Sequence, residues 1–200
     1  DQAWAHCGRI DTLVNNAGVV HTGYALDVPL EQHRHTVEVN YLGNIAGVQA
    51  ALPRFIAQGS GHLVTICSLT AYMPFPSLAS YAGTKHALRA FHHTLAWEYR
   101  EHPLHFTIVY PPAVETPMLA QEAQDDSAIA AFGEPPISAE RMAAKIADAL
   151  ERKPRELAVP ALQGWLLRAF GAFVWIMRIV LADLEKHGRK NLAARRARQA

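Results

Sequence analysis

The sequence predicts an α/β fold with a parallel sheet, because short apolar runs alternate with longer helical patterns along the chain. Three such runs occur at residues 10–14, 62–67 and 106–110. The segments between them have the length of crossover helices, which connect parallel strands within one sheet. Runs this apolar are typical of strands that lie beneath helices on the faces of a sheet.

The first strand and helix are predicted from residues 10–52. The apolar run 10–14 ends abruptly at Asn15-Asn16-Ala17-Gly18, as a buried strand does where it enters a loop. Apolar residues then recur at helical spacing over residues 30–52, and Pro53 predicts a limit or a kink at that point. A Ser-Gly pair interrupts the chain before the second strand at residues 62–67.

A long helix is predicted over about 80–100, followed by a third strand that stops at Pro111-Pro112. Residues 113–137 contain Gly, Pro and acidic residues without a firm period, which predicts a flexible excursion. Ser138 is a candidate N-cap for a helix that extends to about residue 150. Residues 157–159 are predicted to form one more short strand.

The composition indicates an ordinary globular domain. The 200 residues are 50% hydrophobic and 18% charged with a net charge of +1, which excludes disorder and provides no basic footprint for nucleic acid. Cys7 and Cys67 are too few for a disulfide framework, so we expect buried free thiols in a reducing, cytoplasmic compartment. The eleven histidines show no recognised metal-ligand spacing, and no metal site is predicted.

Tyr81 and Lys85 form the first candidate catalytic pair. They lie four residues apart at the start of the long helix, so their side chains emerge on one face. An ammonium beside a phenol stabilises the phenolate, which lowers a pKa that is ordinarily about 10 toward the range useful for proton transfer. Because many solvated helices carry Tyr and Lys at this spacing, the pair needs support from other motifs.

Three further features supply that support. Ser68 ends the second strand, where open parallel sheets place their ligand crevice, and it precedes Tyr81 by 13 residues. Asn40 falls inside the intervening helix, and the third strand leads into the segment 111–116. Together with Asn-Asn-Ala-Gly after the first strand, this order of motifs resembles the classical short-chain dehydrogenase/reductase family. The resemblance implies a Rossmann-like, doubly wound parallel sheet.

The resemblance also implies hydride transfer between NAD or NADP and a small-molecule alcohol or carbonyl substrate. Tyr81 would exchange the hydroxyl proton, while Lys85 would lower its pKa and hold the nicotinamide ribose. Ser68 would orient the substrate oxygen, and Asn40 would support a water-linked proton relay. Such prepositioned donors suit a reaction in which an oxyanion develops and the cofactor carries the redox chemistry.

The cofactor-binding residues that the resemblance implies are Asn16, Ala17, Gly18, Tyr81, Lys85, Val114 and Thr116. One departure is Pro112, because the family usually has Pro-Gly at this point and proline has no N–H to donate. An alternative function is therefore a catalytically idle dinucleotide-binding or membrane-surface scaffold of the same fold. The complete set of Ser68, Tyr81 and Lys85 favours the enzyme.

The family's glycine-rich phosphate-binding loop should precede all of these motifs, yet no such turn lies before Asp11. We therefore expect an N-terminally truncated chain whose sheet lacks its first strands and exposes an apolar edge at residues 10–14. Residues 1–160 would form this partial catalytic domain. Residues 161–200 would form an apolar helix and a basic tail. The chain alone is expected to bind dinucleotide poorly and to show no turnover.

Residues 161–184 carry apolar side chains at helical spacing, with Phe173 on the apolar side and Trp175 opposite. Arg168 and Arg178 interrupt the run, so a membrane span is not predicted. The helix would either pack on the domain, form a homo-oligomer interface, or lie on a membrane surface beside the basic tail. The resemblance also implies a dimer through the long helix at 80–100. The apolar residues here and at 118–119 favour a hydrophobic substrate.

Overall fold

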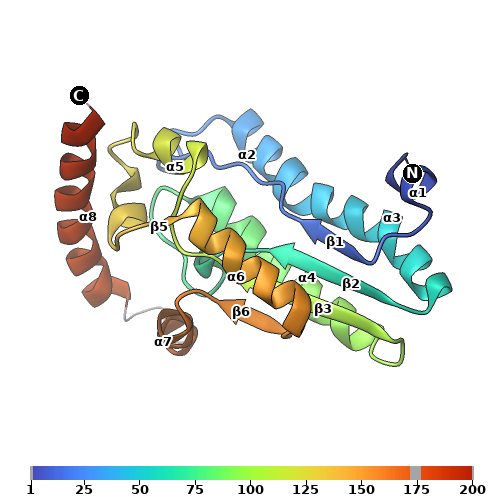
Figure 1. Ribbon diagram of the computed structural model, residues 1–200. Coiled ribbons are helices and arrows are strands. Elements are labelled where there is room, and N and C mark those ends of the chain that lie inside the picture. The colour runs from blue at the N-terminus through green and yellow to red at the C-terminus, as the bar shows by residue number, and fades with distance from the viewer. Residues whose placement is uncertain (1, 172–176, 200) are drawn as a thin grey trace.

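The computed structural model of this chain describes residues 2–171 and 177–199, and it shows a parallel sheet with helices on both faces (Figure 1). The strands of the main sheet lie in the order β1–β2–β3–β6, and every neighbouring pair is parallel. These strands are β1 (Thr12–Asn15), β2 (Gly61–Ile66), β3 (Leu104–Tyr110) and β6 (Glu156–Ala158). The predicted α/β class and strand direction are confirmed.

The helices follow the predicted order with small shifts at their ends. The described helices are α1 (Gln2–Cys7), α2 (Leu30–Val37), α3 (Gly43–Gln58), α4 (Ala79–Glu98), α5 (Pro117–Glu122), α6 (Ala139–Arg152), α7 (Ala161–Gly171) and α8 (Met177–Gln199). A π-helical turn, η1 (Glu38–Leu42), separates α2 from α3, and two 3₁₀ turns are η2 (Leu69–Ala71) and η3 (Ala128–Phe132). Ser138 caps α6 as predicted, because its Oγ accepts a hydrogen bond from the Arg141 amide at 3.1 Å.

Two apolar layers hold the helices on the sheet. On one face Leu63 of β2 packs with Val48 of α3 and Leu95 of α4. On the other face Val64 of β2 packs with Met142 of α6. Because neighbouring residues of a strand point to opposite faces, β2 supplies both layers, and five of its six residues are buried.

Of the limit or kink predicted at Pro53, the limit is wrong. Pro53 lies inside α3, which continues to Gln58. The turn beyond Pro53 is retained because it buries Phe55, of which 1% is exposed, and apolar burial offsets the one backbone hydrogen bond that proline cannot donate. The helix ends at Gly59, whose φ of +70° is the left-handed conformation that glycine adopts without strain.

The segment 113–137 is structured, which corrects the predicted flexible excursion. It contains α5, η3 and two short strands, β4 (Val114–Glu115) and β5 (Ile137–Ser138), which pair in parallel. The partner that holds it comes from the far end of the chain, because Leu192 of α8 packs with Phe132. In Figure 1, α8 stands beside this segment at the edge of the domain. No local period in 113–137 could reveal a partner about 60 residues away.

Other expectations met mixed outcomes. β1 lies at the sheet edge among the described strands, and Val14 is 37% exposed, in line with the predicted apolar edge. Cys67 is buried and free, but Cys7 is free and exposed, which corrects the expectation that both are buried.

The predicted helix over 161–184 is two helices, and Phe173 and Trp175 lie outside the described residues. Within the described ranges, no helix has the length and apolarity needed to cross a membrane.

Candidate active site

The predicted site residues gather where the parallel strands end. Asn16, Ala17 and Gly18 follow β1, Ser68 follows β2, and the segment 111–116 follows β3. With Tyr81 and Lys85 of α4 they line one cavity of about 590 Å³. The carboxyl ends of parallel strands meet at one edge of a sheet, which is why residues so far apart in sequence share this cavity.

Lys85 connects α4 to the end of β2. It is 4% exposed, and its Nζ donates a hydrogen bond to the Ile66 carbonyl at 3.1 Å. A second link is made by the Cys67 Sγ, which donates to the Lys85 carbonyl at 3.3 Å. The Lys85 Nζ lies 5.4 Å from the centre of the Tyr81 ring, so the predicted pair shares one side of α4.

Ser68 lies beside the phenol of Tyr81. Its backbone is extended and its Oγ accepts from the Thr70 amide at 3.2 Å, capping the turn η2. The Ser68 hydroxyl lies close enough to the phenol of Tyr81 to lower the pKa of that group. The turn and the start of α4 therefore bring together two hydroxyl groups that are 13 residues apart in the sequence.

The electrostatics of Tyr81 differ from the prediction. Burial raises the pKa of Tyr81 above its usual value, the Ser68 hydroxyl opposes that shift, and the Glu122 carboxyl adds to it. Burial also lowers the pKa of Lys85. The predicted lowering of the Tyr81 pKa by Lys85 is thus wrong for this form of the protein, because removal of the phenolate from water outweighs the favourable contacts.

Asn40 is part of the site's framework and is absent from the described lining of the cavity. It is fully buried in the π-helical turn η1. Its Oδ1 accepts from the Val19 amide at 2.7 Å, and its Nδ2 donates to the Val19 carbonyl at 2.9 Å and to the Thr84 Oγ1 at 3.3 Å. Asn40 therefore fixes the loop after β1 against α4.

Gly18 lies between the two polar groups that this loop approaches. A Cβ added at Gly18 would be 3.5 Å from the Asn40 Oδ1 and 3.8 Å from the Lys85 Nζ. The missing side chain leaves the loop backbone facing the cavity beside Lys85, as a close approach to a ligand requires. The loop and Lys85 thus fit the predicted role in holding a dinucleotide.

Val114, Thr116 and Pro112 line the same cavity. The Thr116 Oγ1 donates to the Val114 carbonyl at 3.1 Å and accepts from the Leu119 amide at 3.4 Å, which caps α5. The cap positions the following residues Met118 and Leu119 in the wall. Pro112 lines the cavity without a backbone donor.

Several wall residues were not found from the sequence. They are Phe75, Leu78, Glu122, Leu167 and Leu184. Phe75 and Leu78 lie in the loop between η2 and α4, and the other three lie in α5, α7 and α8. No sequence motif relates these segments to the strand ends. Only the apolar character of 161–184 indicated a link to substrate, and the structure places two of its leucines in the cavity.

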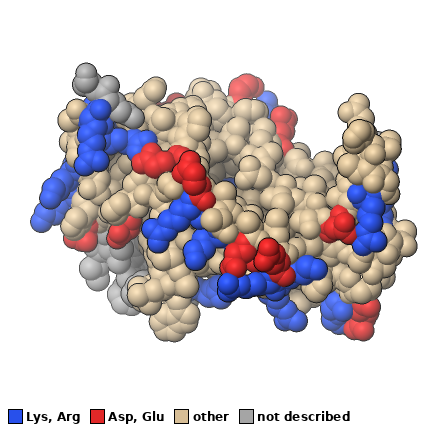
Figure 2. Space-filling model, viewed as in Figure 1, with Lys and Arg blue, Asp and Glu red and all other residues tan. Residues whose placement is uncertain are grey.

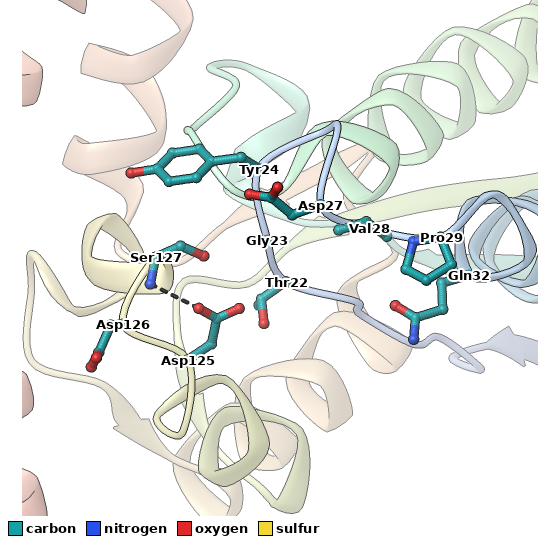
Figure 3. Close-up of a pocket in the computed structure, with 10 residues that line it drawn as sticks. All are labelled: Thr22, Gly23, Tyr24, Asp27, Val28, Pro29, Gln32, Asp125, Asp126 and Ser127. Atoms are coloured by element: carbon teal, nitrogen blue, oxygen red, sulfur yellow. Dashed lines mark hydrogen bonds between the residues drawn. The ribbon is translucent and has the colours of Figure 1, made fainter.

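A second pocket, also of about 590 Å³, lies between the loop 22–32 and residues 125–127 (Figure 3). Its carboxylates are Asp27, Asp125 and Asp126. Asp125 points toward Thr22, and its Oδ1 accepts a hydrogen bond from the Ser127 amide at 2.8 Å. None of the predicted site residues lines this pocket.

Fold and cavity together define an α/β protein with a ligand cavity at the carboxyl ends of a parallel sheet, the arrangement of nucleotide-binding folds. The family model described as short chain dehydrogenase matches residues 1–127. The chain therefore belongs to the short-chain dehydrogenase family, as its motifs predict.

Individual relatives agree with this membership. Dehydrogenase/reductase SDR family member 7B of Danio rerio is 38% identical over 111 residues, which cover 56% of this chain and 36% of that protein. The chain thus matches about a third of the length of this curated relative. The crystal structure of acetoin dehydrogenase YohF from Salmonella typhimurium is 29% identical with a TM-score of 0.66, covering 79% of this chain and 66% of that one. ElxO with NADP bound, 23% identical, shares the fold with a TM-score of 0.68 over 78% of this chain and 68% of its own.

Proposed function

We propose that this chain supplies the catalytic part of an NAD(P)-dependent oxidoreductase that transfers a hydride between nicotinamide and an alcohol or carbonyl substrate. One observation carries the proposal: Ser68, Tyr81 and Lys85 meet at a single cavity at the carboxyl end of the sheet. The same cavity is lined by the loop after β1, which lacks bulky side chains at Ala17 and Gly18. Catalytic and cofactor-holding groups therefore face one space.

The cofactor fits the chain's own residues. Gly18 leaves open the approach to Lys85, whose ammonium can hold ribose hydroxyls, and Val114 and Thr116 line the same cavity. Either NAD or NADP is compatible with these contacts. When bound, the nicotinamide supplies or accepts the hydride.

Tyr81 supplies the proton in the direction of carbonyl reduction. Its raised pKa keeps the hydroxyl protonated at neutral pH, so it can donate to the substrate oxygen as the hydride reaches the carbonyl carbon. Ser68, which lies beside the phenol of Tyr81, donates to the same oxygen and stabilises the charge that develops there. Lys85 stabilises the phenolate that remains, and Asn40 holds the loop after β1 against α4 through its hydrogen bonds with Val19 and Thr84.

The substrate is proposed to have a hydrophobic body. Apolar side chains from four separate segments line the part of the cavity beyond Tyr81, namely Phe75, Leu78, Met118, Leu119, Leu167 and Leu184. Binding an apolar group among them releases ordered water from a largely apolar wall. A small polar substrate would leave much of this wall exposed to solvent.

Tyr81→Phe in the full-length protein tests the assignment. We expect turnover of a carbonyl substrate with NADPH or NADH to fall by about 10³-fold, because the variant keeps the ring and removes the transferable proton. The dissociation constant for the cofactor, measured by fluorescence, should change less than about threefold. Tyr99→Phe, at the far end of the same helix, is the matched control.

Unchanged turnover in Tyr81→Phe would refute the proton-transfer role. A wild-type protein that binds the cofactor tightly and reduces none of a broad panel of ketones and aldehydes would instead support the idle scaffold. The two outcomes can be told apart, because refuting the role of Tyr81 requires measurable turnover by the wild-type protein, whereas an idle scaffold shows none.

We further propose that α7 contacts a membrane surface. Its outer face exposes Leu162 (70%), Trp165 (67%) and Leu166 (38%), whereas Leu167 and Arg168 face the domain. Lys and Arg side chains gather over neighbouring α8 in Figure 2, where they would meet anionic headgroups. Replacing the three exposed residues by serine should abolish flotation with anionic liposomes, while Leu26→Ser, at a leucine that is 99% exposed, should not.

A homodimer through α4 is also proposed. Trp97 on this helix is 67% exposed, which is unusual for a large aromatic side chain and typical of an interface. Trp97→Gln should shift the mass measured by sedimentation from dimer to monomer. A monomeric wild type would contradict the proposal.

A further inference from the structure

Glu122 occupies the catalytic cavity without a role in hydride or proton transfer. It is the last residue of α5, it is partly buried, and it lines the cavity with Tyr81. Its charge acts on Tyr81, whose pKa it raises. Among the described residues, no side chain forms an ion pair or hydrogen bond with its carboxyl group.

Two other carboxylates of the same segment, unlike that of Glu122, are paired with arginine side chains. Arg195 of α8 holds Glu115 through two hydrogen bonds of 2.6 and 2.7 Å. Arg196 of the same helix pairs with Asp126 at 2.7 Å. Two carboxylates of the segment, Glu115 and Asp126, are thus paired with arginines, whereas Glu122 lines the cavity, where a ligand is the available partner.

The charges of the cavity favour a cationic partner. Lys85 is the only Lys or Arg in the described lining, and its ammonium is engaged by the Ile66 carbonyl. Glu134, exposed at the rim, adds a second acidic group. A substrate carboxylate would be repelled by both, whereas an ammonium group would be attracted.

Burial raises the pKa of the Glu122 carboxyl to about 7. Without a partner, the group is therefore partly protonated at neutral pH. A cation within a few ångströms favours the ionised form and gains a charge-assisted hydrogen bond. The buried Leu119 and the nearby Met118 make the adjoining surface apolar, so the ligand must also carry a hydrophobic body.

We propose that Glu122 binds a basic nitrogen of the substrate, so that hydrophobic amino alcohols and the corresponding amino ketones are preferred over uncharged analogues. The substrate preference during turnover rests on the proposed oxidoreductase function. The binding of an apolar amine does not depend on that function. Glu122 is a specificity-determining residue that contacts a basic nitrogen of the substrate and takes no part in the transfer of hydride or proton.

The test compares octylamine with 1-octanol, which share an apolar chain and differ in charge. Their binding to the full-length protein is measured by calorimetry at pH 7. We expect octylamine to bind at least 10-fold more tightly, and Glu122→Gln to weaken octylamine at least 10-fold more than octanol. Glu134→Gln, at the rim, should change the ratio of octylamine affinity to octanol affinity less than threefold. Thermal unfolding of each variant confirms that the fold is retained.

Equal affinity for the two ligands, or a ratio that Glu122→Gln does not alter, overturns the inference. Turnover of octan-2-ol with NAD or NADP is measured separately. Turnover without amine preference leaves the proposed function intact and removes the role of Glu122. Amine preference without turnover of octan-2-ol or 2-amino-1-octanol supports the binding site and counts against the oxidoreductase.

Discussion

The inner and outer walls of the cavity are built in different ways. The inner wall is the end of β2 with the start of α4, where Lys85 and Ser68 are buried and hydrogen-bonded to groups within 20 residues of sequence. The outer wall joins the segment 113–137 to α7 and α8, and it is held by the packing of Leu192 on Phe132 together with ion pairs of Arg168, Arg195 and Arg196. The comparison suggests that chemistry is placed on the rigid core and substrate selection on elements that are easier to alter.

The energetic difference follows from burial. A buried polar group that loses its partner costs about 1–3 kcal/mol or more. Solvent-exposed ion pairs contribute about 0–1 kcal/mol, because water screens the charges and the side chains lose freedom. Changes in the inner wall should therefore have large effects, and changes in the outer wall should be modest and confined mainly to substrate binding.

After Tyr81→Phe, the largest effect is expected for Ser68→Ala, also in the inner wall. Removing the hydroxyl deletes a donor to the substrate oxygen and a partner of Tyr81, so kcat/KM should fall about 10²- to 10³-fold in the full-length protein. Ser60→Ala, at the opposite end of β2, should leave it within twofold. Similar losses in both variants would show that the serine hydroxyl matters only for folding.

Acid is expected to have the next largest effect, because it protonates two buried histidines of β2 and α4 and so lowers the free energy of unfolding. Burial lowers the pKa of His62 to about 4 and of His92 to about 3, and one ring nitrogen of each is buried without a partner in the described structure. Because the unfolded chain binds these protons first, each histidine should remove up to about 1.4 kcal/mol of stability per pH unit below pH 6.5, until the folded pKa is reached. Urea unfolding at pH 7, 6 and 5 measures this slope.

His92→Gln should flatten that pH dependence, whereas His187→Gln, at an exposed position on α8, should not. A slope that is identical in wild type and His92→Gln would show that another group controls the acid sensitivity.

An intermediate effect is expected where α7 is anchored. The carboxyl of Glu156 bonds to His93 at 3.1 Å and to Arg168 of α7, and these contacts lower its pKa to about 2. Its stabilisation is therefore complete above about pH 4.5 and is lost as the pH falls through about 2. Glu156→Gln should cost about 2 kcal/mol at pH 7 by urea unfolding, given that the carboxyl is mostly shielded. Glu151→Gln, exposed on α6, should cost almost nothing.

The smallest effect is expected at the pair of Arg195 and Glu115, although its geometry is bidentate. A double-mutant cycle with Arg195→Gln and Glu115→Gln should give a coupling free energy of about 0.5–1 kcal/mol, because the Glu115 side chain is 43% exposed. The KM for substrate should rise less than fivefold with kcat unchanged. A coupling above 2 kcal/mol would mean that the outer wall is as rigid as the inner one.

The motifs near strand ends could be predicted from local spacing. Tyr81 and Lys85 share a helix face because residues four apart in a helix lie one turn above each other. Ser68 follows a run whose apolar residues identify a buried strand. Pro53 was misjudged because its local cost is outweighed by burial of Phe55, which depends on the sheet beneath. The order in 113–137 was missed because its partners lie in α8.

The sequence by itself determined the fold class, the family and the set of groups able to move a proton, because these follow from the order and spacing of residues along local elements. The tertiary structure decided the protonation and accessibility of those groups. It turned Asn40 from the cavity toward the Val19 backbone, raised the pKa of Tyr81 by burial, and placed Glu122 in the same cavity as Tyr81. Burial and long-range contacts set these properties, and neither is encoded in the spacing of neighbouring residues.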